Sequence, residues 1–367
     1  FRIGASSGAT LNISGAITGT TGTSNLYLSD AGTKILSGSN TYTNITSMTG
    51  GTVRLDYSVN NNSKLADASA LELGWKDNGI VTLLGADNDV AGQIYQAGMS
   101  GATLELSGGN HIEIVSALTL LQGANKISRL SGSTASLQLG AISRTTDNAV
   151  GNQGALDIAS NGIAYTTTAN AGAGTNTMLA GYATVGGAGW AQRFDNTIVG
   201  SAGAVASSAT TDRITIANMV NGSIIRFTTG APAGLATNVD YFVVAATAAD
   251  FQVSATQNGA AIDITANGST GTVITNSDNS TILGTAGSIV STASTDRIAI
   301  PNMQNGQLVR FIVNAPTGLT TNTDYFVVNA TSTDFQVATA LGGTFINFTT
   351  DGTTGTVART GQINAAF

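Results

Sequence analysis

Residues 101–115 read GATLELSGGNHIEIV, and this stretch contains the pattern that decides the fold. Apolar and polar residues alternate around Leu104/Leu106 and again around Ile112/Ile114, with a Ser-Gly-Gly-Asn corner between them. Alternation with a period of two predicts strands with one buried face, and Gly and Asn are typical of turns. The pattern recurs at Leu11/Ile13, Leu26/Leu28, Val53/Leu55, Leu71/Leu73, Val81/Leu83, Leu137/Leu139 and Leu156/Ile158.

Strands this short do not form stable isolated hairpins, so they need neighbouring strands above and below them. They recur irregularly, about once per 20 residues, which lies within the range of stacked repeat architectures. We therefore predict an all-β protein in which residues 1–193 form a parallel β-helix, or solenoid. A β-sandwich of hairpins is the main alternative, but two-residue Asn-Gly turns are scarce in residues 1–190.

One segment resembles a known family. Residues 32–55, GTKILSGSNTYTNITSMTGGTVRL, contain a Leu-Ser-Gly-Ser-Asn-Thr-Tyr-Thr run followed by Gly-Thr-Val-Arg-Leu, and this order resembles the autotransporter-associated β-strand repeat. Residues 101–108 and 154–158 are weaker echoes, and residues 179–191 also resemble a segment of long proteins of this type. The resemblance implies a right-handed β-helix in a large bacterial protein that is secreted or displayed at the surface.

The second half contains an internal repeat at an offset of 84 residues. The segment from Asp212, DRITIANMVNGSIIRFTTGAPAGLATNVDYFVVAATAADFQV, aligns without a gap with the segment from Asp296, DRIAIPNMQNGQLVRFIVNAPTGLTTNTDYFVVNATSTDFQV. A match of this length indicates duplication. We predict two tandem β-sandwich or barrel-like modules, at residues 194–277 and 278–360, followed by a C-terminal strand at residues 361–367.

Each module is expected to contain about six strands separated by Asn-Gly and Pro-containing turns. In the first copy we place them at residues 214–216, 224–228, 241–245, 251–254, 262–265 and 272–274. We expect the aromatic residues to form the two cores, namely Phe227, Tyr241, Phe242 and Phe251 in the first copy and Phe311, Tyr325, Phe326 and Phe335 in the second. The modules are similar to small β-modules of phage tail-associated and bacterial surface proteins, which implies a role as spacers or decorations.

Composition excludes several classes of function. The formal net charge is −7 with only 10% charged residues, and an acidic surface repels phosphate, so we expect no nucleic-acid partner. The chain has no cysteine, which excludes disulfides and thiolate metal sites. No stretch approaches the ~18 apolar residues of a membrane helix, so we expect no membrane span.

His111, the only histidine, alternates with Glu113 along one predicted strand. The two side chains would then lie on one face within hydrogen-bond reach, as a hydrolytic dyad requires. No nucleophile motif accompanies them. We interpret them as a polar pair on the solvent-exposed face.

The sequence Asp87-Asn88-Asp89 offers oxygen ligands of the kind that Ca²⁺ prefers, but no calcium-loop spacing surrounds it, so we favour a turn. The run Gly186-Gly187-Ala188-Gly189 lacks the Lys-Ser/Thr of a phosphate-binding loop and is interpreted as a bend.

Charged residues recur at equivalent positions of the two modules. We interpret them as ion pairs within a module, or as charges that protect a strand edge, rather than as ligand-binding groups. They are Asp212/Arg213, Asp296/Arg297, Arg226 and Arg310.

These observations favour a structural protein over an enzyme. A polysaccharide-cleaving β-helix needs clustered carboxylates or a basic residue beside them, and we recognise no such cluster. We expect no catalytic, cofactor-binding or metal-binding residues, and no cofactor.

The ends of a β-helix expose unpaired backbone groups that recruit other chains. Since the C-terminal residues 361–367, GQINAAF, are strand-like and uncharged, we predict that the ends pair with neighbouring copies in a head-to-tail fibre. The protein would be an extracellular or cell-surface filament subunit. The alternative is an adhesin or glycan-binding passenger of a bacterial surface protein or phage tail fibre, and a polysaccharide-degrading enzyme is less favoured.

Overall fold

The chain forms two compact units. In this computed structural model the first unit comprises Phe1–Gly172, Asn176–Arg193 and Gln362–Ala366, and the second comprises Ala173–Thr175, Phe194–Gly361 and Phe367. The structure describes residues 1–19, 24–74, 101–144, 154–171, 178–194, 197–200, 205–219, 221, 223–237, 239–256, 259–269, 271–275, 282–284, 289–312, 314–354 and 357–365.

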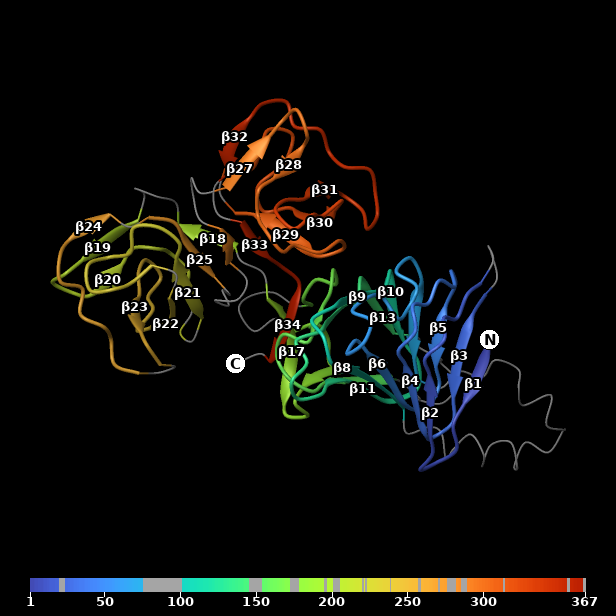
Figure 1. Ribbon diagram of the computed structural model, residues 1–367. Coiled ribbons are helices and arrows are strands. Elements are labelled where there is room, and N and C mark those ends of the chain that lie inside the picture. Colours follow the sequence, from blue (N-terminus) through green and yellow to red (C-terminus); the bar gives the residue numbers. More distant parts are fainter. Residues whose placement is uncertain are drawn as a thin grey trace. The chain divides into compact units, whose positions relative to one another are not determined.

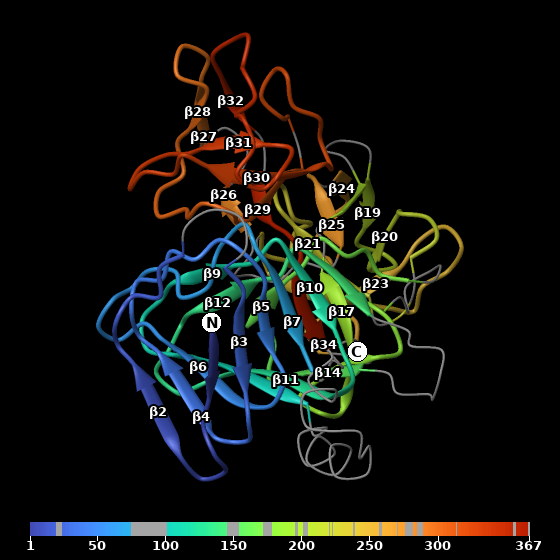
Figure 2. The same ribbon diagram turned by 90° about the vertical axis from the view of Figure 1, so that its right-hand side faces the viewer.

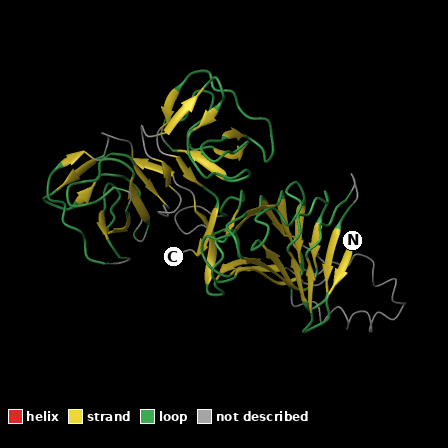
Figure 3. Ribbon diagram, viewed as in Figure 1, coloured by secondary structure: helices red, strands yellow, loops and turns green. Residues whose placement is uncertain are grey.

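Strands are the only regular secondary structure in the described part of the chain, and Figure 3 shows no helix there. The prediction of an all-β protein is therefore confirmed. The two units differ in how their strands pair. Parallel pairs dominate the first unit, whereas the ladders of the second are antiparallel.

One sheet of the first unit consists entirely of parallel strands. Figure 2 shows part of it, with β3, β5 and β7 side by side. Successive strands of this sheet come from later parts of the chain, and the strands between them in sequence belong to the second sheet. The order is β1 (Arg2–Gly4), β3 (Leu26–Ser29), β5 (Thr46–Met48), β7 (Ala70–Leu73), β10 (Ala117–Leu120) and β13 (Ala141–Arg144).

The second sheet of this unit begins with a parallel ladder in the same chain order. It runs through β2 (Thr10–Ile13), β4 (Thr33–Leu36), β6 (Gly51–Asp56), β8 (Ala102–Ser107), β11 (Gly123–Arg129), β14 (Gly154–Ile158) and β16 (Ala183–Val185). It continues through β17 (Gly189–Phe194) and β34 (Gln362–Ala365), and then through the parallel strands β15 (Ala164–Tyr165), β12 (Ser136–Gln138) and β9 (Ile112–Ile114).

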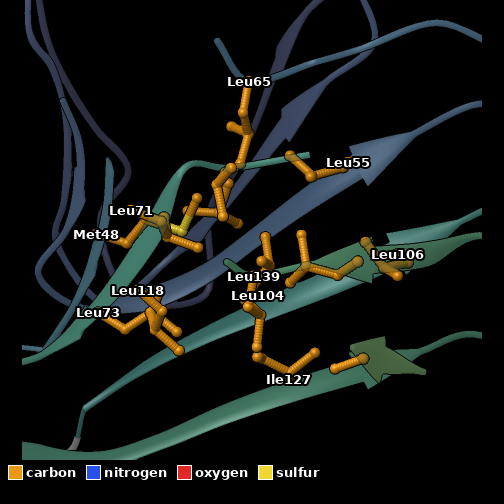
Figure 4. Close-up of a cluster of buried hydrophobic side chains, with 14 of the residues drawn as sticks. Met48, Leu55, Leu65, Leu71, Leu73, Leu104, Leu106, Leu118, Ile127 and Leu139 are labelled. Atoms are coloured by element: carbon orange, nitrogen blue, oxygen red, sulfur yellow. The ribbon is translucent and has the colours of Figure 1, made fainter. Parts of the chain in front are cut away.

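The core of the first unit lies between these ladders. Val53, Leu104, Ile127 and Ile158 are successive neighbours in register, and each is fully buried or nearly so. Such in-register columns follow from the alternation seen in the sequence, because every second residue of each strand points to the same face. Figure 4 shows the packed leucines of the two sheets meeting in one cluster, among them Leu71, Leu73, Leu104 and Leu106.

Glycine occupies corners where strands of neighbouring turns approach closely. Gly51, the first residue of β6, has φ +63°, and a Cβ atom there would lie 2.4 Å from the Asp30 carbonyl oxygen. Gly101, before β8, has φ +85°, and a Cβ atom would lie 2.1 Å from the Ala124 carbonyl oxygen. A side chain at either corner would both strain the backbone and separate the strands.

The two repeats in the second unit have the same pair of antiparallel sheets. In the first repeat the sheets are β18 (Thr197–Gly200), β25 (Val273–Thr275), β21 (Ile224–Phe227), β22 (Asp240–Val244) and β23 (Gln252–Ser254), and β20 (Arg213–Ile214), β19 (Ala206–Ser208) and β24 (Gly268–Ser269). In the second they are β26 (Ile282–Gly284), β33 (Val357–Arg359), β29 (Leu308–Phe311), β30 (Asp324–Val328) and β31 (Gln336–Ala338), and β28 (Arg297–Ile298), β27 (Ile289–Thr292) and β32 (Gly352–Thr354).

Two expectations for the modules were wrong. Residues 262–265 form no strand, because their backbone groups bond to separate partners, including Val253, Ala233 and the Asp212 carboxylate. Phe242 is only half-buried, although Phe227 and Phe251 are fully buried. Tyr241 already takes the core-facing position of β22, and adjacent residues of a strand point to opposite faces. Phe326 is half-buried for the same reason.

Candidate functional site

We call the two sheets of the first unit the stack. The first candidate site is the end of the stack at which β1 and β2 are the outermost strands. In the described residues, β1 pairs only with β3, and β2 pairs only with β4. Within the described residues, no strand pairs with the other side of either one. Edges of this kind template the addition of another strand.

Apolar side chains are exposed at the same end. Leu11 belongs to the column that continues inward through Lys34 and Val53, but no further strand covers it, and it is 39% exposed. Phe1 is 54% exposed, and Ile3 and Ile13 are only partly buried against the core. The strand β2, Thr-Leu-Asn-Ile, carries neither a charge nor a proline, which are the usual protections of an edge.

At the opposite end, the chain itself adds two strands to the second sheet. The strand β17 pairs antiparallel with β16, placing Val185 opposite Gly189, and β34 pairs antiparallel with β15, placing Tyr165 opposite Gln362. The two added strands are neighbours in the sheet. They turn both terminal strands away from solvent and bury Ile363 completely.

Asparagine side chains fix β34 in this position. The backbone N–H of Gly162 donates to Oδ1 of Asn364 at 2.9 Å, and the N–H of Ala365 donates to Oδ1 of Asn161 at 2.9 Å. In this structure the C-terminal strand therefore pairs within its own chain, and its pairing with a neighbouring copy stays a prediction. Among the described residues, β1 and β2 are the outermost strands of the two sheets at one end, while β13 and β9 are the terminal strands at the other ends of these sheets.

The second candidate site surrounds His111 and Glu113, and here the expected location was wrong. Glu113 is fully buried rather than on a solvent-exposed face. Its carboxylate accepts hydrogen bonds from the Tyr57 hydroxyl at 2.7 Å and from the backbone N–H groups of Lys64 and Leu65 at 2.9 and 2.8 Å. It thereby holds residues 57–65 against β9. Alternation alone could not show this, because the loop covers what would otherwise be the outer face.

Burial dominates the electrostatics of this cluster. Loss of solvation raises the pKa of Glu113 to about 7, although the hydrogen bonds from the backbone N–H groups and Tyr57 oppose the shift. Loss of solvation also lowers the pKa of His111 to about 4, helped by the nearby Lys64 charge. At mildly acidic pH both groups are therefore neutral in the folded protein.

His111 lies against Ser63 and Tyr57. Its Nε2 is 3.2 Å from the Ser63 hydroxyl oxygen, and its ring centroid is 5.3 Å from that of Tyr57. Glu113 bonds elsewhere, so the described contacts do not join serine, imidazole and carboxylate in the sequence that nucleophilic catalysis requires. The cluster is arranged to fasten a loop.

The recurring charges of the modules form ion pairs inside each module. Arg213 pairs with Asp250 at 2.6 Å rather than with its neighbour Asp212, whose carboxylate accepts the backbone N–H of Ile264. Arg226 is fully buried and donates from Nε to Asp240 at 2.8 Å.

The second repeat has the same pairs. Arg297 contacts Asp334 at 2.5 Å, and Arg310 contacts Asp324 at 2.7 Å. Asp296 accepts the backbone N–H of Phe348. The charged residues of these three contacts are identical in the two copies. Only the residue whose backbone N–H bonds to the aspartate differs, being Ile264 in the first copy and Phe348 in the second.

Lys34 is a buried charge that the alternation did not reveal. Its side chain points into the core, and its Nζ donates to the carbonyl oxygens of Ser29, Asp30, Gly32 and Gly50 at 2.8–3.1 Å. Burial lowers its pKa to about 8. The ammonium ties the corner before β4 to the corner before β6. The strand alternation could have predicted this burial. Lys34 and Leu36 are two residues apart in one strand, so they lie on the same face, and Leu36 faces inward.

The remaining motifs provide no binding site. The run 186–189 lies in the turn that joins β16 and β17, and Gly187 donates its N–H to Asp157 at 2.7 Å. Residues 87–89 lie outside the described residues. Within the described residues, no group of three or more His, Asp or Glu side chains could hold a metal ion, and no helix is long and apolar enough to cross a membrane.

Comparison with known proteins identifies no relative: no protein-family profile matches the chain, and no curated protein or solved structure shows significant similarity to it.

Proposed function

We propose that the first unit is a β-solenoid, in which each turn of the chain adds one strand to each ladder. Three features support this interpretation. Strands that alternate in sequence fall into two separate parallel ladders, the registers stay constant along each ladder, and the apolar side chains form continuous buried columns. The resemblance of residues 32–55 to a β-helical repeat agrees with it.

We further propose that the protein is an extracellular structural subunit that assembles with copies of itself. The observation that carries this proposal is the difference between the two ends of the stack. At one end β17 and β34 extend the second sheet, whereas at the other end β1 and β2 each pair on one side only among the described residues, β2 carries no charge, and apolar side chains are partly exposed. Natural sheets usually block such an edge.

Pairing of two such ends would bury the exposed residues and satisfy the backbone at once. Because the same surface is used by both partners, the contact is isologous. The strand β2 itself carries no charge, while β1 contributes Arg2 to this surface. The tandem modules, which repeat one scaffold twice, would then decorate the assembly.

The proposal is tested by placing a charge on the open end. Light scattering and negative-stain electron microscopy should show wild-type particles larger than a single copy, and Leu11→Lys should reduce their size by removing the contact through β1 and β2. Val59→Lys is the matched control, because Val59 is 82% exposed but lies outside β1 and β2. It should assemble like the wild type.

Monomeric wild-type protein at high concentration would overturn the proposal. So would assemblies that Leu11→Lys leaves intact while circular dichroism shows a folded protein. Binding of surface glycans by such monomers would instead support the adhesin alternative.

A further inference from the structure

The strands β17 and β34 are neighbours in the sheet although residues 194–361 separate them in sequence. Figures 1 and 2 both show them side by side at one end of the first unit. The two modules are therefore an insertion between adjacent strands. The last strand of the stack is added only after the chain has passed through both modules.

The strand β34 is held by β15 and β17. Its ladder with β15 contains one residue pair, Tyr165 and Gln362, and its buried apolar anchor is Ile363. The two asparagine bonds described above, a hydrogen bond from the Gly162 N–H to the Ile363 carbonyl oxygen at 3.3 Å and pairing with the neighbouring strand β17 add to the attachment. The segment Gln-Ile-Asn-Ala of β34 carries no charge. It can therefore insert between β15 and β17, or leave this position, without moving an ion out of water.

The connection that precedes β34 is short. Strand β33 ends at Arg359 and β34 begins at Gln362, so only Thr360 and Gly361 lie between the module and the stack. Gly361 has φ +80°, a conformation that glycine adopts readily. Short hinges before an exchangeable element favour its transfer to another copy.

We propose that β34 is exchanged between copies, so that the C-terminal strand of one molecule fills the slot between β15 and β17 of another. Every contact of the strand is reproduced in the exchanged form, so the exchange costs little beyond association. This inference rests on the proposed self-assembly and supplies its second contact.

The exchange explains how a pairwise contact could yield a fibre. Pairing through β1 and β2 alone closes after two copies, because both open ends are used. Reciprocal exchange of β34 joins the other ends of two molecules. Alternation of the two contacts continues without limit.

Cysteine trapping tests the exchange directly, because the natural chain has no cysteine. A Cβ atom at Gly189 would lie 3.0 Å from that of Ala365, which a small adjustment brings to the spacing of a disulfide. Gly189→Cys and Ala365→Cys are made in separate proteins, which are mixed, assembled and oxidised. A disulfide-linked pair containing one copy of each variant is expected.

The control replaces Gly189→Cys by Gly181→Cys, because Gly181 is exposed and has no atom within 4 Å of its Cβ position. This mixture should give at least tenfold less of the mixed pair. A peptide with the sequence of residues 361–367 should shorten the assemblies, and the same peptide with Ile363→Asp should not.

The outcomes separate the two proposals. Fibres without the mixed disulfide would overturn strand exchange and leave self-assembly standing. The mixed disulfide without fibres would support exchange but overturn the filament function. Monomers without the disulfide would overturn both.

Discussion

The stack and the modules neutralise buried charge in different ways. In the stack, Lys34 is held by backbone carbonyl oxygens and Glu113 by backbone N–H groups and a tyrosine, with no opposite charge in direct contact. In the modules, Arg226 and Arg310 each bond to an aspartate of the neighbouring strand. A charged side chain that bonds to backbone groups holds one particular loop in place. A cross-strand ion pair lies within a single module, so duplication of the module duplicates the pair.

This comparison predicts that neither Lys34 nor Glu113 can be removed without a loss of stability. Each fixes backbone groups that have no substitute, while a module arginine leaves behind a carboxylate that water can reach. The following predictions start with the largest expected effect. Unfolding of the first unit can be followed separately by fluorescence, because both tryptophans, Trp75 and Trp190, lie within its sequence limits.

The largest effect is expected for Glu113→Ala. It leaves the buried N–H groups of Lys64 and Leu65 and the Tyr57 hydroxyl without their acceptor, which should cost roughly 3–5 kcal/mol of unfolding free energy. Urea unfolding followed by tryptophan fluorescence measures it. Glu113→Gln retains an acceptor and should cost much less. Equal losses for the two variants would show that the carboxyl group does not hold the loop.

Next in size is the pH dependence of the same cluster. The raised pKa of Glu113 removes stability as the pH rises from its ordinary value near 4.5 to about 7, on the order of 3 kcal/mol in total. The lowered pKa of His111 removes stability as the pH falls from 6.5 to about 4. The two slopes oppose each other between pH 4.5 and 6.5, so the wild-type unit should be nearly insensitive there.

Single substitutions should reveal each slope. Glu113→Gln leaves the histidine alone, so stability should rise from pH 4 to 6.5. His111→Gln leaves the carboxyl alone, so stability should fall from pH 4.5 to 7. Urea midpoints measured across this range test both, and parallel profiles for the two variants would contradict the assignment.

A smaller effect is expected in the modules. Arg226→Met should destabilise its module by roughly 2 kcal/mol, because Asp240 remains about one-third exposed and can be hydrated. Arg310→Met should cost less, because the Arg310 side chain is itself 12% exposed, against 0% for Arg226. Near-ultraviolet circular dichroism of the tyrosines follows both. Equal costs would mean that this difference in burial has no energetic weight.

The smallest effect concerns Asp250. Its pKa lies below the ordinary value, first because of the hydrogen bond from Thr247 and then because of Arg213. A lowered carboxyl pKa contributes stability above about pH 4 that is lost on further acidification. Thr247→Val should therefore weaken the acid resistance of the first module more than Arg213→Met. Acid titration followed by circular dichroism would contradict this if the arginine variant were the more sensitive.

The local pattern of the sequence predicted much of the architecture but little of the polar chemistry. Pairs such as Leu104/Leu106 identified core-facing positions because burial follows strand alternation. The same rule, applied to Tyr241, places Phe242 on the opposite face, so naming both as core residues was wrong. Glu113 was misplaced because its partners, Tyr57 and the loop after it, are distant in sequence.

The sequence by itself determined the all-β class and the duplication after residue 194, because period-two alternation and repetition are local properties of a chain. Only the tertiary structure decided which end of the stack is covered. Any backbone of suitable geometry can pair with a strand. The sequence of residues 361–367 therefore predicts a strand but not the strand with which it pairs. The fold assigns that strand to β15 and β17, and among the described residues it gives β1 and β2 a partner on one side only.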